Sequence, residues 1–320
     1  MAFTDSSKQG IRFAFLPLSL RFVLRDLSIL GNSILMHSAN MLIRPLKQIE
    51  AKNLKEEIKK GTIKRVLINR NDRIGDAVLS LKIIRELANH LGETYVLASN
   101  QNEFILKELK GVKIIKSNDL NEAGLAFDLV IDFIGSLASD KTIRTRYKIG
   151  FNRGLSSIGY TCFYQTNLSE SGKQVIDASV GLIDHCLGIR LHIDDLPPDD
   201  FKKVKKKQTL IFVGNKPNRN LPYSKWKELI LLSAGKNKTI VADDPDQIIM
   251  NQLRSDNQIA QNKNIELIVG QRQLTDLAKI ANDSNLFISL DGGAEHYLER
   301  YTNSVTFYTC GYPLNWKPYA

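Results

Sequence analysis

Asp76 stands where a general base would be expected. It follows Gly75, and the pair lies between the apolar run of residues 65–68 and the helical spacing of residues 77–84. A carboxylate at a helix start can take a proton from an attacking hydroxyl group, and the helix dipole favours its ionised form. We expect neighbouring Arg73 and Gly75 to contact the molecule that carries this hydroxyl. The alternative is that Asp76 only caps the helix.

A second candidate site runs from Asp291 to His296. Gly292, Gly293 and Ala294 open the predicted helix of residues 294–301, after the apolar run of residues 286–290. Backbone N–H groups at such a helix start can reach an anion. The segment is therefore a candidate cradle for a diphosphate, with a plain Gly-Gly turn as the alternative.

A basic loop over residues 214–222 gives a third candidate. Arg219 offers a fork of N–H donors that suits phosphate oxygens, and we expect Asn215 to contact the same ligand. Solvent-exposed basic residues in a loop are the alternative. Asp244 and Asp246 form a D-x-D pair that could hold a divalent metal. The alternatives are that Asp246 contacts a ribose of the ligand or only caps the next helix.

The spacing of apolar residues predicts two α/β halves that bring these segments together. Short apolar runs alternate with helical patterns from residue 64 to residue 188 and again from residue 209 to residue 301. This alternation is typical of parallel, doubly wound sheets, which bind ligands beyond the carboxyl ends of their strands. Each candidate segment follows a predicted strand, so we expect a ligand between the halves. The usual G-x-G-x-x-G dinucleotide motif is absent after the first strand.

The net charge and the cysteine content indicate which classes of partner and which compartment to expect. The 320 residues carry a net charge of +10, which favours an anionic partner such as a phosphorylated small molecule or an acidic membrane. The sequence has no aromatic-basic motif of the RNA-recognition type, so we expect no nucleic acid. Three cysteines without a C-x-x-C pair indicate neither a zinc knuckle nor a redox pair and fit a reducing compartment, so we expect a cytoplasmic protein.

Residues 1–60 differ from the rest of the chain. Ten basic and five acidic side chains give this segment a net charge of +5, and apolar residues dominate residues 11–46. The longest uncharged run is too short and too polar for a confident membrane-spanning helix. We expect basic, amphipathic helices that either pack on the protein itself or lie on the inner face of the cytoplasmic membrane.

Four segments carry a resemblance through their order and spacing. They are residues 73–79 (RIGDAVL); residues 128–132 with residues 146–151; the basic loop that leads to Leu221, Pro222 and Trp226; and residues 291–296 (DGGAEH) with residues 316–319 (WKPY). Over about residues 63–320 the chain resembles glycosyltransferase family 9, the lipopolysaccharide heptosyltransferases and their relatives.

The resemblance implies a GT-B fold, in which two Rossmann-like domains face a cleft, and an inverting, metal-independent sugar transfer. It implies a nucleotide-sugar donor, in that family often ADP-heptose, a lipopolysaccharide core as acceptor, and no further cofactor. The family's catalytic base corresponds to Asp76, its donor motif to Asp291, Gly293 and His296, and its phosphate-contacting lysine to Arg219. We expect an extension over residues 1–60, an acceptor domain over 61–190, a linker over 191–207 and a donor domain over 208–320.

Several positions depart from the family pattern, among them Arg219 in place of the lysine and two residues at the expected cradle. Gly292 stands where serine or threonine is usual, which removes a hydroxyl contact to phosphate, and Glu295 places an acid beside the expected cradle. Two other functions stay open: a non-catalytic protein that binds a nucleotide-sugar or nucleic acid, and a metal-dependent transferase that uses Asp244 and Asp246.

Overall fold

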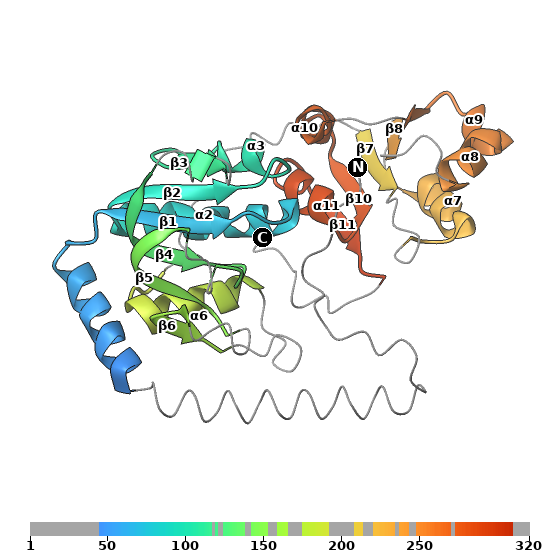
Figure 1. Ribbon diagram of the computed structural model, residues 1–320. Coiled ribbons are helices and arrows are strands. Elements are labelled where there is room, and N and C mark those ends of the chain that lie inside the picture. Colours follow the sequence, from blue (N-terminus) through green and yellow to red (C-terminus); the bar gives the residue numbers. More distant parts are fainter. Residues whose placement is uncertain are drawn as a thin grey trace, which may run out of the picture.

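The computed structural model describes most of the chain after residue 44. The described residues are 45–116, 119–120, 124–137, 142–152, 159–165, 175–191, 208–213, 220–233, 237–242, 248–269 and 273–309. Two parallel sheets with their helices make up two halves (Figure 1), so the predicted α/β class is confirmed. No helix in these ranges combines the length and the apolar character needed to cross a bilayer.

The first half contains a six-stranded parallel sheet in the order β3-β2-β1-β4-β5-β6. Its strands are β1 (Arg65–Arg70), β2 (Glu93–Ala98), β3 (Lys113–Lys116), β4 (Ala126–Asp132), β5 (Arg144–Phe151) and β6 (Cys162–Tyr164). Its helices include α2 (Ile74–His90), α3 (Glu103–Leu106) and α6 (Val175–Leu187). β1 lies between β2 and β4, so the strand order reverses beside it, and such a reversal is where doubly wound sheets bind ligands.

The second half contains a five-stranded parallel sheet in the order β11-β10-β7-β8-β9. Its strands are β7 (Gln208–Val213), β8 (Asn237–Ala242), β9 (Ile265–Val269), β10 (Leu286–Leu290) and β11 (Ser304–Phe307). Its helices include α7 (Tyr223–Leu232), α8 (Ile248–Ser255), α9 (Asn257–Ala260), α10 (Leu274–Asn282) and α11 (Gly293–Leu298). Here the order reverses at β7 and β10, and the segment that starts at Asp291 follows β10.

The two halves meet through α2 and α11, which lie side by side in Figure 1. One hydrophobic cluster includes Leu81 and Ile84 of α2 as well as Tyr297 and Leu298 of α11. The Tyr297 ring packs edge-on against the Phe104 ring, with centroids 5.5 Å apart. Burial of apolar surface between the halves therefore holds the starts of both helices at a shared junction.

A helix over residues 45–59 packs against the first half, at the side away from the second half (Figure 1). Leu54 is fully buried in the core, and Glu57 pairs with Arg146 at 2.6 Å and accepts a hydrogen bond from the Tyr147 hydroxyl at 3.1 Å. For these residues, packing on the protein itself is confirmed. Residues 1–44 of the predicted extension lie outside the described residues.

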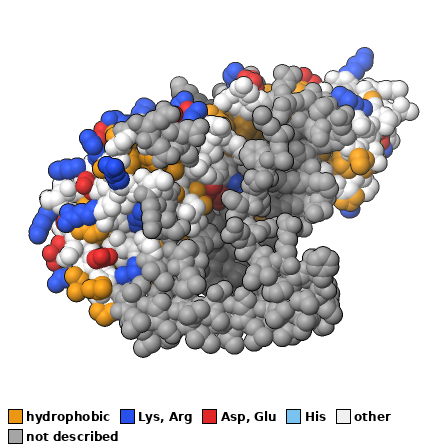
Figure 2. Space-filling view, in the orientation of Figure 1, with side chains coloured by type: hydrophobic (Ala, Val, Ile, Leu, Met, Phe, Trp, Pro, Cys, Tyr) orange, Lys and Arg blue, Asp and Glu red, His pale blue; other side chains and the backbone are white. Residues whose placement is uncertain are grey.

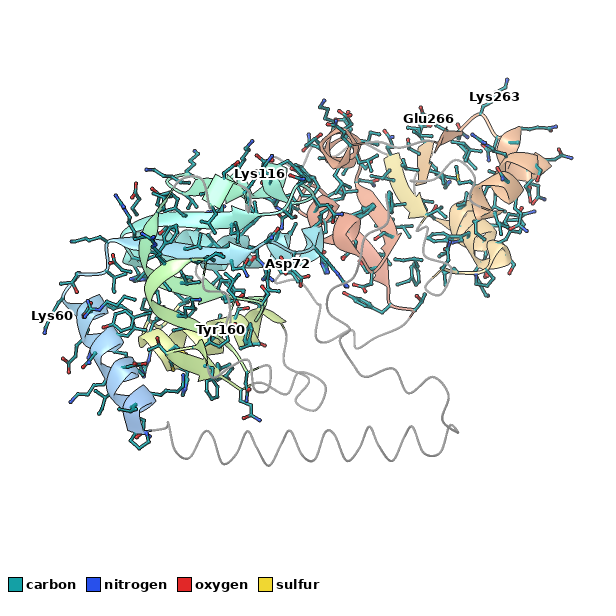
Figure 3. The ribbon with its side chains drawn as sticks, in the orientation of Figure 1. Lys60, Asp72, Lys116, Tyr160, Lys263 and Glu266 are labelled. Carbon is teal, nitrogen blue, oxygen red and sulfur yellow. The ribbon has the colours of Figure 1, made fainter. Side chains whose placement is uncertain are left out.

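A buried carboxylate organises the end of β4. Asp132 is 0% exposed and accepts hydrogen bonds from the Asn69 amide at 2.8 Å and the Tyr160 hydroxyl at 2.6 Å. It also accepts three bonds from the backbone N–H groups of Ile134, Gly135 and Leu137. These donors compensate the cost of burying a charge. Tyr160, labelled in Figure 3, reaches Asp132 because Gly150 has no side chain: a Cβ there would lie 2.5 Å from the Tyr160 ring.

We expect Gly150→Ala to lower the free energy of unfolding by about 1–3 kcal/mol, the usual range for overpacking a filled site. The added methyl group would displace Tyr160 and take one donor from the buried Asp132. Urea denaturation measures the effect. Gly292→Ala is the matched control, because a Cβ there meets nothing within 4 Å. Equal stability of the two variants would contradict the packing at Gly150.

Candidate active site

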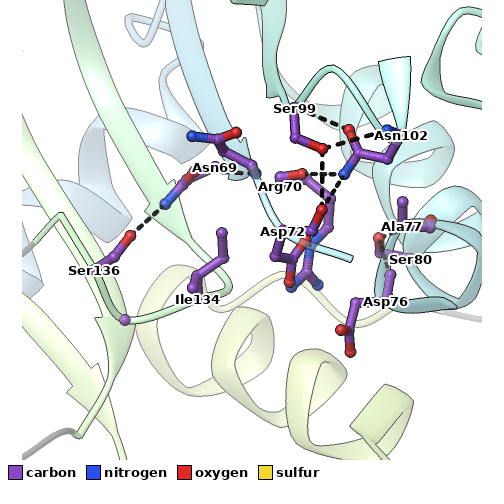
Figure 4. A network of polar contacts seen from close by, with 12 residues as sticks. Asn69, Arg70, Asp72, Asp76, Ala77, Ser80, Ser99, Asn102, Ile134 and Ser136 are labelled. Carbon is purple, nitrogen blue, oxygen red and sulfur yellow. Dashed lines mark hydrogen bonds and ion pairs between the residues drawn. The ribbon is translucent and has the colours of Figure 1, made fainter. Parts of the chain in front are cut away.

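Asp76 lies in the first turn of α2, beyond the carboxyl end of β1, and its side chain is partly exposed. The cap position is Arg73, whose backbone is extended and whose side chain makes no capping bond. The capping alternative for Asp76 is therefore wrong: it comes three residues later and no described residue hydrogen-bonds its carboxylate. In Figure 4 this carboxylate points away from the neighbouring polar network. It is available to accept a proton from a bound hydroxyl group.

The loop before α2 is fixed by two side chains that follow β2 (Figure 4). The Asn102 amide, fully buried, donates to the carbonyl oxygens of Arg70 at 2.7 Å and Asp72 at 3.2 Å. The Ser99 hydroxyl donates to the Asp72 carbonyl at 3.0 Å. These bonds satisfy buried backbone groups and set the start of α2, and therefore the direction of Asp76. Neither residue was predicted from the sequence, although polar residues directly after a predicted strand indicate this position.

A second carboxylate in this loop, Asp72, is already paired. Arg70, which is buried, donates from Nε to Asp72 Oδ1 at 2.9 Å and makes a further contact to Oδ2. Burial raises the pKa of Asp72; Arg70 opposes this shift and the nearby charge of Asp76 adds to it. Figure 3 places Asp72 at the side of the first half that faces the second. Because Arg70 occupies the Asp72 carboxylate, the Asp76 carboxylate is the one of the two that is open to a hydroxyl group of a bound molecule.

The predicted segment at Asp291–His296 lies against the start of α2. Gly292 is the cap of α11, with extended backbone, and Gly293 is its first residue. A Cβ on Gly293 would lie 3.1 Å from the Ile74 Cβ, and a Cβ on Gly75 would lie 3.0 Å from the His296 Cδ2. Gly75 and Gly293 therefore permit close contact between two helix starts. Gly292 borders open space instead, so its backbone is the part that a ligand can approach.

A buried charge cluster supports α11. His296 is 2% exposed, and its Nδ1 lies 3.0 Å from Glu295 Oε2 and 3.8 Å from Glu299 Oε1. The Nδ1–H does not point at the Glu295 oxygen, so the contact is an ion pair without an aligned hydrogen bond. Burial opposes the charge, but the two carboxylates outweigh it and raise the pKa of His296 to about 10. His296 is thus a cation at neutral pH, and its Nε2 lies 3.8 Å from Asp291 Oδ1.

Glu295 is the second member of this buried charge cluster. It is 1% exposed, and its Oε1 accepts a hydrogen bond from the Thr306 hydroxyl of β11 at 2.8 Å. Burial works against its charge, yet the contact with His296 holds the pKa of Glu295 below its ordinary value. Glu295 therefore follows the glycines of the expected cradle directly, but its carboxylate is buried and paired with Thr306 and His296.

The carboxylates of Asp291 and Glu295 and the His296 ring could in principle hold a metal ion, because one ligand atom from each lies within 4.8 Å of the others. A metal ligand histidine must be neutral, whereas the pKa of His296 is raised to about 10. A cation would therefore have to replace the His296 proton, and the ion pair fits these residues better.

The structure thus brings Arg73, Gly75 and Asp76 to the same junction as residues 291–296. Acidic side-chain atoms are visible between the two halves in Figure 2. The other predicted donor contacts, Asn215, Arg219 and Asp246, lie outside the described residues, as does Asp244. Their roles stay predictions.

The fold of this chain is similar to that of solved glycosyltransferases, although no relative was found by sequence. No protein-family model and no curated relative matches the sequence. The heptosyltransferase WaaC of E. coli, solved with ADP, matches with a TM-score of 0.62 and 16% identity, over 80% of this chain and 91% of its own. A family 9 glycosyltransferase from Veillonella parvula matches with a TM-score of 0.61 and 17% identity, over 80% and 83%. This chain has the fold of these glycosyltransferases.

A third solved structure has the same fold. ADP-heptose lipopolysaccharide heptosyltransferase II of E. coli matches with a TM-score of 0.57 and 17% identity, over 79% of this chain and 88% of its own. The resemblance that the four segments predicted is therefore confirmed at the level of the fold.

The charge cluster predicts how stability depends on pH. Burial, opposed by His296 and aided by Glu295, raises the pKa of Glu299 from 4.5 to about 8. The folded state then keeps this proton longer than the unfolded state, so stability falls as the pH rises from 4.5 through 8. The contribution of charged His296 is present below its unfolded pKa of 6.5 and is lost as the pH rises through about 10.

We therefore expect the melting temperature to be lower at pH 9 than at pH 6. Glu299→Gln mimics the protonated side chain and should reduce the fall between pH 5 and pH 8, as measured by thermal denaturation. Glu228→Gln, at an exposed position of α7, serves as the control and should follow the native protein. A profile of the Glu299 variant that also follows the native protein would refute the raised pKa.

Proposed function

We propose that this protein is an inverting, metal-independent glycosyltransferase. It transfers a sugar, a heptose, from a nucleotide-sugar to a lipopolysaccharide core or a related glycolipid. The observation that carries the proposal is the position of Asp76: its carboxylate has no hydrogen-bonding partner among the described residues and stands where the start of α2 meets the start of α11. The fold shared with heptosyltransferases supports the same conclusion.

In this proposal residues 61–190 bind the acceptor, and residues 208–320 bind the donor after a linker over 191–207. Asp76 takes the proton of the acceptor hydroxyl, and Arg73 and Gly75 border that site. As the acceptor oxygen forms its bond to the anomeric carbon, the bond from that carbon to the diphosphate breaks on the opposite face. General-base help of this kind accelerates proton transfer by about 10²- to 10⁴-fold.

The leaving diphosphate gains negative charge in the transition state, and fixed positive groups stabilise it. We assign this role to the backbone N–H groups of Gly292, Gly293 and Ala294, together with charged His296 behind them. Asn215, Arg219 and Asp246 complete the donor site, with Asp291 at its edge. The E. coli relative WaaC was solved with ADP, which favours an ADP-linked donor, and ADP-heptose is the donor that we propose.

The test combines donor binding with turnover. Calorimetry with ADP-, UDP- and GDP-sugars should show tightest binding for the ADP-sugar. Asp76→Asn should keep this affinity, because Asp76 acts on the acceptor, and should lower kcat by about 10²- to 10⁴-fold. Asp184→Asn, at an exposed position of α6, is the matched control and should behave as the native enzyme.

Three outcomes would overturn the proposal. Near-native turnover by Asp76→Asn would refute the general base. Donor binding without transfer to any glycolipid would indicate a non-catalytic binding protein. Loss of activity on chelation of divalent ions, restored by Mg²⁺ or Mn²⁺, would favour the transferase that depends on Asp244 and Asp246.

We also propose that the protein works in the cytoplasm, in peripheral contact with the inner face of the membrane. The helix over residues 45–59 exposes Leu46 and Ile49, at 66% and 58%, and Figure 2 shows hydrophobic atoms at its outer end. Basic residues Lys52, Lys59 and Lys60 lie on the same helix and its end, and all three are exposed. Apolar and basic side chains together are typical of helices that lie on anionic bilayers.

Replacing both exposed residues, Leu46→Asp with Ile49→Asp, should reduce co-sedimentation with vesicles of phosphatidylglycerol and phosphatidylethanolamine several-fold. The reason is that charged side chains oppose insertion into the acyl boundary. Leu232→Asp is the control: Leu232 is more exposed than either residue, at 77%, but lies in the second half. Equal vesicle binding by the double variant and the control would exclude membrane contact through this helix.

A further inference from the structure

Two cysteines far apart in sequence lie together at the edge of the first half. Cys162 belongs to β6 and Cys186 to α6, and the His185 side chain lies beside them. One ligand atom from each of the three residues lies within 4.8 Å of the other two. The cysteine spacing, 24 residues, gave no sign of this cluster, because the two residues come from different elements.

The packing of β6 on α6 explains the cluster. Cys162 and Tyr164 are two residues apart on a strand, so their side chains share one face. The Tyr164 ring lies over Gly181, where a Cβ would be 2.8 Å from the ring, and 5.7 Å from the His185 ring centre. Gly181 thus lets β6 approach α6 closely. As a result, Cys162 lies next to His185 and Cys186.

The surroundings favour a thiolate at Cys162. The thiol of Cys186 lowers the pKa of Cys162, burial opposes this, and the positive charges of Lys55 and Lys47 add to the lowering. Burial, together with the neighbouring Cys162, raises the pKa of Cys186. Both thiols lose their protons when a cation binds, as thiol ligands generally do.

We propose that Cys162, His185 and Cys186 bind one Zn²⁺ ion. Two thiolates and an imidazole are the soft ligand set that zinc prefers, in tetrahedral geometry with ligands 2.0–2.3 Å from the metal. His185 is exposed, so water can take the fourth position. Binding releases the two thiol protons to solvent.

This site is separate from the candidate active site. β6 is the edge strand of the first sheet, and β4 and β5 lie between it and β1, which Asp76 follows. A bound ion would join this three-residue edge strand to α6 across a 24-residue separation. Its effect is expected on the stability of the first half, because a clip between distant residues restricts the unfolded chain.

The alternative chemistry for the same residues is a disulfide between Cys162 and Cys186. The third ligand decides between the two: His185 contributes to a metal site and has no part in a sulfur–sulfur bond. The test therefore examines His185 as closely as the cysteines.

The experiment uses the full-length, reduced protein after removal of metals with a chelator. Anaerobic titration with Co²⁺ should show one equivalent bound, with a thiolate-to-cobalt charge-transfer band and the visible bands of tetrahedral cobalt, and Zn²⁺ should displace it. Zn²⁺ should also raise the melting temperature. Cys162→Ser and His185→Gln should each weaken Zn²⁺ binding by more than about 100-fold, because loss of an outer-shell partner alone costs 10–100-fold.

Cys310→Ser and His90→Gln are the controls, and each should bind Co²⁺ as the native protein does. The proposal fails if no charge-transfer band forms, if His185→Gln binds as tightly as the native protein, or if Cys310→Ser abolishes binding. Recovery of a Cys162–Cys186 disulfide from protein purified without reductant, combined with no Co²⁺ binding by the reduced form, would assign the pair to redox chemistry instead.

Discussion

The close contact between Gly75 and Gly293 is the constraint on which the candidate active site depends. A Cβ on Gly75 would lie 3.4 Å from the Gly293 Cα and 3.0 Å from the His296 ring. Any larger side chain at either glycine would move the two helix starts apart. The function proposed for the Asp76 carboxylate and the Gly292 backbone requires both to reach the same bound molecules, and these two glycines keep their helices close enough for that.

The same contact sets the electrostatics of the junction. α2 and α11 both direct the positive ends of their dipoles towards it, and His296 adds a buried positive charge. The negative charges at the junction come from Asp76 and Asp291. Asp72 lies there too, but Arg70 neutralises its charge. Fixed charges that are oriented before a ligand binds need no reorganisation during reaction. In the proposed reaction the diphosphate lies at the positive side of this arrangement, and the hydroxyl group that must lose its proton lies at the negative side.

The strands that position the site were predictable because they are buried on both faces. β1 and β10 read as short apolar runs, and the chemically important residues follow each run directly. β5 was not predicted as a strand, because its sequence, RTRYKIGF, mixes charged with apolar residues. β6 has three residues and β11 has four, and none of these seven residues is buried. Such strands are defined by their neighbours in the sheet, which local sequence does not reveal.

Contacts between residues far apart in the sequence were the other feature that the sequence did not predict. The places of Asp76, Gly293 and His296 at the starts of two helices were predictable from the sequence. Asn102 and Asp132, by contrast, act on partners 30 or more residues away. The segment Asn69–Asp76 contains several polar residues, and its sequence does not show which of them form hydrogen bonds or ion pairs within the protein. Only the pairing of Asp72 with buried Arg70, and the bonds from Asn102 to the loop, separate the supporting residues from Asp76.

Glu295 shows how a departure from the family pattern can be accommodated. An acid next to a diphosphate would oppose binding if it were exposed there, yet the first turn of α11 directs this side chain inward, to Thr306 and His296. Glu295 then keeps His296 protonated, and a buried ion pair whose members hold each other in place costs far less than an isolated charge. The acid that seemed to weaken an anion site therefore maintains the cation behind it. In the proposed donor site this cation compensates for the hydroxyl group that Gly292 lacks, since a charged partner interacts with phosphate more strongly than a neutral hydroxyl.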